Sequence, residues 1–478
     1  MTPMSGRRTP RVIGRRTAVV AAVATVVAGA LVASATGTGE IAGSASATET
    51  ADRDLPESVD VVTLHDSGPL DQATKDRAIN AANIAGASWR VVSTASSAMT
   101  RLSRGGFTVQ AAAPDFSYPM STTFLPDDLI ATLMGADVLT GLSDRTLVMS
   151  SGTAALRGAQ AGDVVTLRHV FGGTRDFTIT QIVDDAITGG TELLMLPSAA
   201  SRLGVDRESR VMIWGFDSRE SIMQALAAAD AVANASVGPG AIHDPVGTAR
   251  PIRLRRSWDP RDPDGTLGMA AMKIALGEFT YRVNPGSDWV TVDSAWTSAN
   301  LPSSRVSLGI GIVARCHRVL EPQLRAAFAE VAARGLSGAI DVNNANSAGG
   351  CFGPRFNRLS PNSSVGFLSR HTWAAAIDLN TIRDCQGCDP PSMAVRPGGC
   401  DVVRIMRAVG FSWGGNYTTP DGMHFEYVGE DRSQIPYPSR YCPNLVSGSA
   451  LNDELPLELT ERSVLFADAG LIDGHSHD

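Results

Sequence analysis

Polar and apolar residues in the first half of the chain alternate in short runs, which are separated by turn residues and alanine-rich stretches. Runs with the two-residue period of a strand lie at Phe107–Gln110, Thr146–Met149, Asp163–Leu167 and Phe177–Ile182. Helical spacing occurs over Leu70–Arg104 and again over Ser221–Ala235. The pattern predicts an N-terminal α+β domain at residues 51–243.

The second half of the chain combines two helical patterns with two short strands. The segment Glu321–Arg334 carries apolar residues at helical spacing, and Gly335 is placed to end that helix. A second helix is predicted at Val402–Val409, and strands are predicted at Ala376–Asn380 and Met423–Val428. We expect α+β structure here too, with helices packed on a small, mainly antiparallel sheet.

The N-terminus has the composition of a secretory signal peptide. Residues 1–16 contain five arginines and no acid, Ala18–Ala33 is apolar, and small residues follow. The apolar run is shorter than the roughly 18 residues of a membrane span. We therefore expect residues 1–47 to be removed on export, with a retained anchor as the alternative.

Two further segments are set apart by composition. Residues 244–305 begin rich in Pro, Asp and Arg, which predicts a linker and a lead-in to a second domain at 306–445. Residues 446–478 form an acidic tail. Its His475-Ser-His477 lacks the upstream pattern of a metal site, so we do not assign it metal binding.

Net charge and the positions of the lysines argue against two classes of function. Without residues 1–47 the chain has 36 basic and 48 acidic residues, a net charge of −12, which disfavours nucleic acid as a partner. The only lysines are Lys75 and Lys273, and neither follows a serine at the Ser-x-x-Lys spacing. That absence excludes the serine-type peptidases that need this motif.

Six cysteines, all between Cys316 and Cys442, indicate disulfides in an exported protein. We favour a bridge between Cys316 and Cys351. The pair Cys385-Gln-Gly-Cys388 also fits a redox motif or half of a zinc ribbon, but neither a thioredoxin-like pattern nor a second such pair is present.

The candidate chemistry lies in two segments, Ser369–Asp378 and Asp421–Glu426. His371, Asp378 and His424 offer two imidazoles and a carboxylate, a donor set that holds a catalytic Zn²⁺ and leaves one position for water. Asp421 stands at a turn three residues before His424, where it can act as general base. Glu426 competes for that role, and we prefer it as a group that orients a ligand.

These residues resemble the zinc D-Ala-D-Ala carboxypeptidase and L-Ala-D-Glu endopeptidase family. Its pattern S-x-H-x-x-G-x-A-x-D matches Ser369, His371, Ala376 and Asp378, with Ala374 in place of the glycine. An alanine there is strained by roughly 1 kcal/mol if the backbone has a positive φ.

The second half of the family pattern is similar to Asp421 and the His424-Phe-Glu426 that follows it. The resemblance implies zinc held by His371, Asp378 and His424, supported by Ser369 and Glu426, with Asp421 as general base. It also implies that Arg355, in GCFGPR, contacts substrate or an oxyanion.

Thr146–Leu167 carries a limited resemblance to the extracytoplasmic core domain of permeases of the cell-division and macrolide-export class. This resemblance implies a binding or regulatory module and a cell-envelope protein partner.

The expected function is a secreted or cell-wall-associated zinc metallopeptidase that hydrolyses peptidoglycan stem peptides. Two alternatives stay open: a non-catalytic wall-binding or regulatory protein, and a zinc D-Ala-D-Ala dipeptidase.

Overall fold

The structure is a computed structural model, and it describes residues 61–65, 70–188, 190–229, 242–243, 267–344, 349–357, 366–416, 420–429, 431 and 441–442. The predictions for residues 1–47, 244–266 and 446–478 lie outside these ranges. Helices and sheets are both present, as expected for mixed α+β structure. Among the described helices, none has the length and apolarity to cross a bilayer.

The N-terminal region is built around a ring of six strands. Pairing runs β2–β4–β8–β5–β7–β6 and returns from β6 to β2, so the sheet closes on itself. The pairs β4–β8 and β5–β7 are parallel, and the other four pairs are antiparallel. The ring strands are β2 (Ser88–Arg104), β4 (Tyr118–Phe124), β5 (Thr146–Ser150), β6 (Val164–Arg168), β7 (Thr174–Val183) and β8 (Leu193–Met195).

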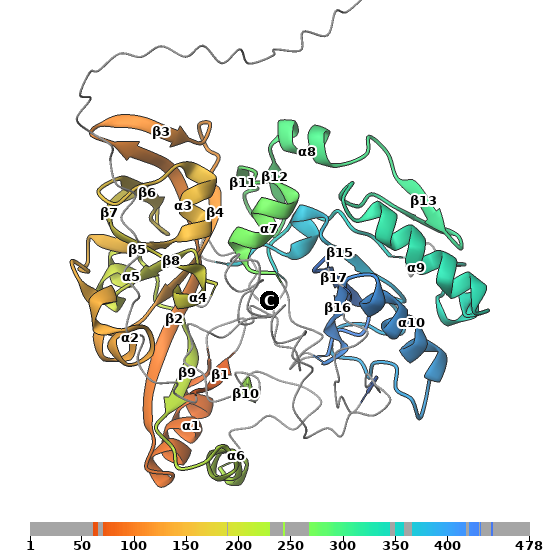
Figure 1. Cartoon of the computed structure of the whole chain (residues 1–478), viewed down its shortest axis with the longest axis horizontal. Helices are drawn as coiled ribbons and strands as arrows, with labels where there is room; N and C mark the ends of the chain where they lie inside the picture. The colour runs from red at the N-terminus through yellow and green to blue at the C-terminus, as the bar shows by residue number, and fades with distance from the viewer. Residues whose placement is uncertain are drawn as a thin grey trace, which may run out of the picture. The chain divides into compact units, whose positions relative to one another are not determined.

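Further strands and helices surround this ring (Figure 1). β9 (Glu208–Trp214) pairs with β2 and with β1 (Val61–His65), β1 also pairs with β10 (Ile242–His243), and β3 (Phe107–Ala111) forms a hairpin with β2. The helices here are α1 (Gln72–Ile84), α2 (Asp127–Met134), η1 (Ala136–Leu139), α3 (Ser151–Arg157), α4 (Asp185–Thr188), α5 (Pro197–Leu203) and α6 (Arg219–Ala228). The predicted strands at residues 107–110, 146–149, 163–167 and 177–182 are thus confirmed to within a few residues.

The predicted helical spacing over residues 70–104 is wrong in its second half. α1 ends at Ile84, Gly86 follows at φ +67°, and residues 88–104 form the long strand β2. β2 pairs with β3, β4, β6 and β9. The preference of a segment for strand structure depends on such neighbouring strands. The small and β-branched residues of this segment are compatible with a helix, but they form a strand because other strands pair with them.

The C-terminal region packs helices against a three-stranded antiparallel sheet in the order β15–β17–β16. These strands are β15 (Ala376–Asp378), β16 (Phe411–Trp413) and β17 (His424–Tyr427). α9 (Glu321–Ala333) and α10 (Pro397–Ala408) lie beside each other, and α10 also contacts β16 (Figure 1). The remaining elements are α7 (Met269–Leu276), β11 (Tyr281–Val283), β12 (Val290–Val292), α8 (Ser294–Asn300), β13 (Val306–Gly309), β14 (Ile312–Ala314), η3 (Ser337–Ala339), η4 (Arg370–Trp373) and η5 (Gly414–Asn416).

Both predicted helices of this region are confirmed, with one boundary moved. α9 buries Leu324, Phe328 and Val331, and Gly335 follows it at φ +70°. α10 begins at Pro397, five residues before the predicted start, because a proline is tolerated in the first helical turn, where no N–H is needed.

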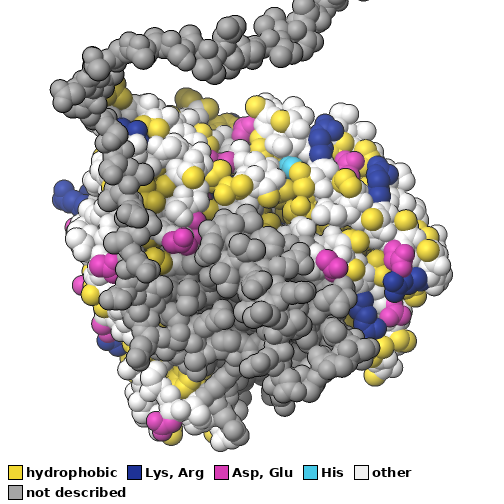
Figure 2. Space-filling view, viewed as in Figure 1, with side chains coloured by type: hydrophobic (Ala, Val, Ile, Leu, Met, Phe, Trp, Pro, Cys, Tyr) yellow, Lys and Arg dark blue, Asp and Glu magenta, His cyan; other side chains and the backbone are white. Residues whose placement is uncertain are grey.

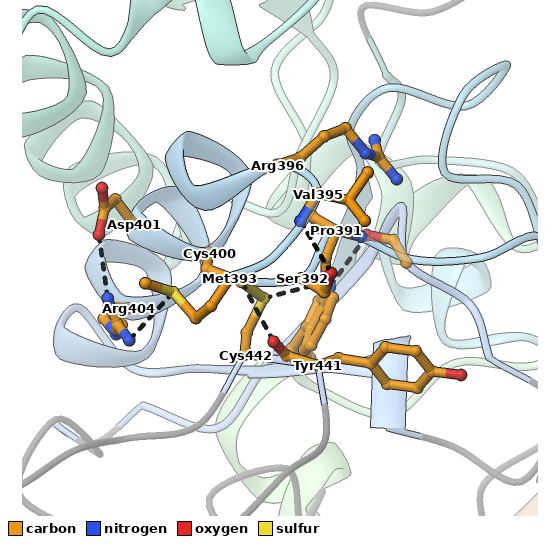
Figure 3. The surroundings of a disulfide bond; sticks show 12 residues. Pro391, Ser392, Met393, Val395, Arg396, Cys400, Asp401, Arg404, Tyr441 and Cys442 are labelled. Atoms are coloured by element: carbon orange, nitrogen blue, oxygen red, sulfur yellow. Dashed lines mark hydrogen bonds and ion pairs between the residues drawn. A yellow bond between two sulfur atoms is a disulfide. The ribbon is translucent and has the colours of Figure 1, made fainter.

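Three disulfides fasten this region: Cys316–Cys351, as predicted, Cys385–Cys388 and Cys400–Cys442. The third joins α10 to the segment Tyr441–Cys442 (Figure 3). The backbone N–H of Met393 donates to the carbonyl of Tyr441 at 3.2 Å, and Arg404 reaches Asp401 at 3.0 Å. The segment after the sheet is therefore fixed to the helix that packs on it.

A group of four buried ionisable side chains joins α7 to the six-stranded ring. We name it the Lys273 cluster; its members are Arg157, Glu192, Lys273 and Glu278. The ammonium of Lys273 lies 2.8 Å from Glu192 and 3.1 Å from Glu278, and Arg157 pairs with Glu278. On the surface drawn in Figure 2, basic and acidic side chains are scattered among other residues.

Candidate metal centre

The first ligand, His371, sits in a single helical turn. The Oγ of Ser369 accepts from the backbone N–H of His371 at 3.3 Å and so caps η4. The turn ends at Ala374, whose φ of +52° is left-handed, and β15 begins two residues later. The strand predicted at Ala376–Asn380 is confirmed for Ala376–Asp378, and Ala374 occupies the backbone conformation that favours glycine.

The three predicted ligands converge. The Nε2 of His371 and the Nδ1 of His424 each lie 3.1 Å from the Oδ1 of Asp378. The three donor atoms lie within 4.8 Å of one another, the one group of this kind in the described ranges. Tetrahedral Zn²⁺ with bonds of about 2.0–2.2 Å separates its ligand atoms by about 3.3 Å. The donor set therefore fits such an ion.

Hydrogen bonding fixes which nitrogen of His371 faces Asp378. The Nδ1 of His371 lies 2.9 Å from the carbonyl oxygen of Cys351, which only accepts. Nδ1 must therefore carry the proton, and in the neutral ring Nε2 presents a lone pair. Nε2 is therefore the nitrogen of His371 that can bind a metal ion in the neutral ring, or donate a second proton to Asp378 in the charged ring.

His424 lies between two carboxylates. Its Nδ1 faces Asp378, and its Nε2 lies 3.6 Å from Glu426. Burial lowers the pKa of His424, but hydrogen bonds to Asp378 and Glu426 outweigh it and raise the pKa to about 10. Burial likewise raises the pKa of Asp378, yet the charges of His371 and His424 bring it below its usual value. The carboxylates of Asp378 and Glu426 thus strongly favour a positive charge at this site.

The candidate base, Asp421, is held by backbone contacts. It forms an isolated antiparallel bridge with Gln386, inside the Cys385–Cys388 loop, and its N–H donates to the carbonyl of Gly414 at 2.8 Å. Its Oδ1 is buried without a hydrogen-bond partner. Burial raises the pKa of Asp421 to about 6, although His424 lowers it.

Residues 362–427 match the model of a family described as D-alanyl-D-alanine carboxypeptidase. The match includes all three ligands and Asp421, and it supports a peptidase. It spans less than half of the chain. No curated protein matches the chain.

Residues just before the matched segment support η4, the turn that carries His371. Gly353 donates its N–H to the carbonyl of His371 at 3.0 Å, and Arg355 exchanges a backbone hydrogen bond with the hydroxyl of Thr372. The Cys316–Cys351 bridge anchors the residue whose carbonyl accepts from His371. The GCFGPR motif is therefore a scaffold for the metal centre as well as the source of Arg355.

Arg355 points its guanidinium along this turn. Its Nη1 lies 3.2 Å from the Oγ of Ser369. Arg355 therefore lies beside the turn that carries His371, and its contact with substrate stays a prediction.

Gly349 is required by close packing. It has φ +84°, and a Cβ at this position would lie 1.8 Å from the carbonyl oxygen of Asp378. Only glycine fits the contact.

Arg370 is a residue that sequence reasoning missed. It is buried, and its Nε lies 3.0 Å from Glu426. It also donates to the carbonyl of Leu267 at 2.9 Å. Arg370 thus holds the carboxylate that faces His424. Its place between Ser369 and His371 was the one available signal.

Glu426 is occupied by this ion pair, which favours Asp421 over it as the base. The Nε2 of His317 lies 3.0 Å from the carbonyl oxygen of Leu276. Burial lowers its pKa. His317 is a structural, hydrogen-bonded histidine.

Proposed function

We propose that the protein is a zinc peptidase that hydrolyses peptidoglycan stem peptides, of the D-Ala-D-Ala carboxypeptidase or L-Ala-D-Glu endopeptidase type. The observation that carries the proposal is the buried Oδ1 of Asp421, which has no hydrogen-bond partner beside a His-Asp-His donor set. An unpartnered buried carboxylate oxygen is costly unless a ligand or water completes it. The match of residues 362–427 supports the choice of substrate.

His371, Asp378 and His424 would hold Zn²⁺, which when bound lowers the pKa of a water molecule to about 7 and polarises a carbonyl. Glu426, held by Arg370, orients the imidazole of His424 through its Nε2. Cys351 does the same for His371 through its carbonyl.

Asp421 takes the proton of the attacking water and then delivers it to the nitrogen of the leaving amine. The C–N bond breaks as the new C–O bond is completed, so one water is consumed for each peptide bond cut. Arg355 binds a carboxylate of the substrate or the oxyanion that develops at the carbonyl.

We infer that this chemistry takes place outside the cytoplasm. Three disulfides support an oxidising compartment. We also propose that the N-terminal region is a binding or regulatory module for a cell-envelope partner.

Digestion of purified muropeptides with pentapeptide stems, read by mass spectrometry, tests the proposal. Carboxypeptidase activity removes one alanine mass, whereas endopeptidase activity cuts between the first two stem residues. Chelator should stop either reaction and added Zn²⁺ should restore it. Free D-Ala-D-Ala in a parallel digest separates a dipeptidase from both.

Asp421→Asn should retain stoichiometric zinc and lose turnover by about 10²–10⁴-fold. Asp389→Asn is the matched control, because Asp389 is an exposed acid in the same region. Intact muropeptides with fully zinc-loaded wild-type protein would reject the enzyme and favour the wall-binding alternative.

A further inference from the structure

An exposed tryptophan lies opposite Arg355 in the backbone. Trp289 and Arg355 form an antiparallel bridge. The N–H of Val290 donates to Pro354 at 2.9 Å, and the N–H of Phe356 donates to Asp288 at 2.8 Å. Because these bonds flank the pair, Trp289 and Arg355 are a non-hydrogen-bonded pair, the kind whose side chains share a face and approach most closely.

The shared face is that of the metal centre. The guanidinium of Arg355 lies 3.2 Å from the Oγ of Ser369, the residue that caps the turn carrying His371. A second bridge, Phe356 with Leu368, carries the same backbone on to Ser369, whose N–H donates to Arg355 at 3.0 Å. Three backbone segments thus lie side by side: the segment of Trp289, the segment of Arg355, and the segment of Ser369 that leads into the turn of His371.

The indole is positioned but not packed into the core. Trp289 is 52% exposed, whereas its neighbour Val290 is 3% exposed. Its backbone is fixed, since the N–H of Trp289 donates to the Oγ of Ser287 at 3.1 Å and its carbonyl accepts from Asn284 at 3.3 Å. An exposed tryptophan on a rigid hairpin offers a large apolar surface at little cost in entropy.

We propose that Trp289 and Arg355 form a substrate subsite for a group that combines a carboxylate with a flat C–H surface. Arg355 pairs with the carboxylate, and the indole of Trp289 packs against the C–H surface. Such a surface is supplied by a pyranose ring of the glycan or by an aliphatic stem side chain. The subsite rests on the proposed function and adds to it a specificity-determining residue that touches substrate outside the metal centre.

Steady-state kinetics of Trp289→Ala on two substrates test the subsite: a free stem pentapeptide, and the same peptide carrying its disaccharide. KM should rise about tenfold with kcat within twofold of wild type, a loss typical of a removed aromatic contact. A KM effect confined to the disaccharide substrate identifies a sugar ring, and an equal effect on both identifies the peptide. An unchanged KM on both overturns the subsite.

Two controls separate this contact from a structural role. Trp289→Phe should recover most of the affinity, and Phe171→Ala, which removes an 85% exposed aromatic from the N-terminal region, should leave KM unchanged. Zinc content and melting temperature should equal wild type in all three variants. A fall in either for Trp289→Ala, without rescue by phenylalanine, overturns the subsite in favour of a structural role.

Failure of the proposed function has a different signature. If the zinc-loaded wild type cuts neither substrate, calorimetric titration of the two compounds into wild type and Trp289→Ala still reads the subsite. A Kd about tenfold weaker in the variant supports it. Equal Kd values, or no binding by wild type, overturn it.

Discussion

The Lys273 cluster and the metal centre are both buried groups of ionisable side chains, but they are assembled on opposite principles. In the Lys273 cluster each cation touches an anion, with Lys273 against Glu192 and Arg157 against Glu278. In the metal centre two imidazoles share one anion, since His371 and His424 are both directed at the Oδ1 of Asp378. The first arrangement pairs opposite charges, whereas the second gathers three groups that can each donate an electron pair to a metal ion.

The comparison distinguishes buried charges that stabilise the fold from buried charges that form a candidate binding site. Complementary pairs offset their own desolvation and hold two parts of the fold together. Two imidazoles that converge on one carboxylate oxygen exceed what simple pairing requires, and such a group marks a candidate binding site. Opposite consequences are expected when each group is altered.

The largest expected effect is that of Asp378→Asn. The amide keeps a hydrogen-bonding oxygen but loses the charge that attracts the metal, so zinc and activity should both be lost, the latter by on the order of 10³-fold. Zinc content by atomic absorption and muropeptide turnover provide the measurement. The metal-free variant should still melt cooperatively. Retention of stoichiometric zinc would contradict the assignment of this ligand.

Glu192→Gln should instead destabilise the fold, by about 3 kcal/mol, and leave zinc content unchanged. It leaves Lys273 buried with one anion fewer, and breaking a buried pair is costly. Chemical denaturation measures the change.

The matched control is Glu208→Gln, which removes the partner of the other lysine, Lys75. Glu208 is 51% exposed, so the loss there should stay below about 1 kcal/mol. Equal losses at Glu192 and Glu208 would refute the distinction between the two lysines.

Acid should weaken the Lys273 cluster. Burial raises the pKa of Glu278, but Lys273 and Arg157 outweigh it and hold the pKa below the usual 4.5. A carboxyl whose pKa is lowered by folding stabilises the protein above the unfolded value, and this contribution is lost as pH falls through the folded one.

The melting temperature should therefore fall more steeply below about pH 4.5 in wild type than in Glu278→Gln. Glu330→Gln, which alters an exposed ion pair, serves as control and should follow wild type. Parallel curves for wild type and Glu278→Gln would show that Glu278 does not stabilise the folded state through its charge.

The smallest expected effect is a gain. Ala374→Gly should stabilise the fold by about 0.5–1 kcal/mol, because glycine adopts the φ of +52° without strain. Ala375→Gly, one residue on, should destabilise it. Equilibrium unfolding of the two variants measures both signs, and a loss of stability in Ala374→Gly would mean that the buried methyl group contributes more than the strain costs.

The grouping of His371, Asp378 and His424 could be predicted from the sequence because their spacing and residue types are those of a metal site. The partners that orient them could not. The carbonyl of Cys351 reaches His371, and the guanidinium of Arg370 reaches Glu426, through tertiary packing that no local pattern records. Trp289 is likewise ordinary in sequence, and it gains meaning only from its place opposite Arg355.

The fold was predictable to the same degree. Helix α9 follows from its apolar spacing and from Gly335 after its end, whereas α10 was predicted only from Val402 onward. The long strand β2 did not, because its conformation is decided by its sheet partners rather than by its own residues. Closure of the ring, through the pairing of β2 with β6, is a property of strands far apart in sequence.

The carbonyl of Cys351 joins two kinds of chemistry that are normally separate. The sulfur of this residue is bonded to Cys316, and its backbone oxygen holds the imidazole of His371. One residue thus connects a disulfide to the candidate ligand His371: its side chain anchors the backbone, and its carbonyl orients the imidazole. We expect reduction of this disulfide to loosen the support of His371 without altering any of the three donor side chains.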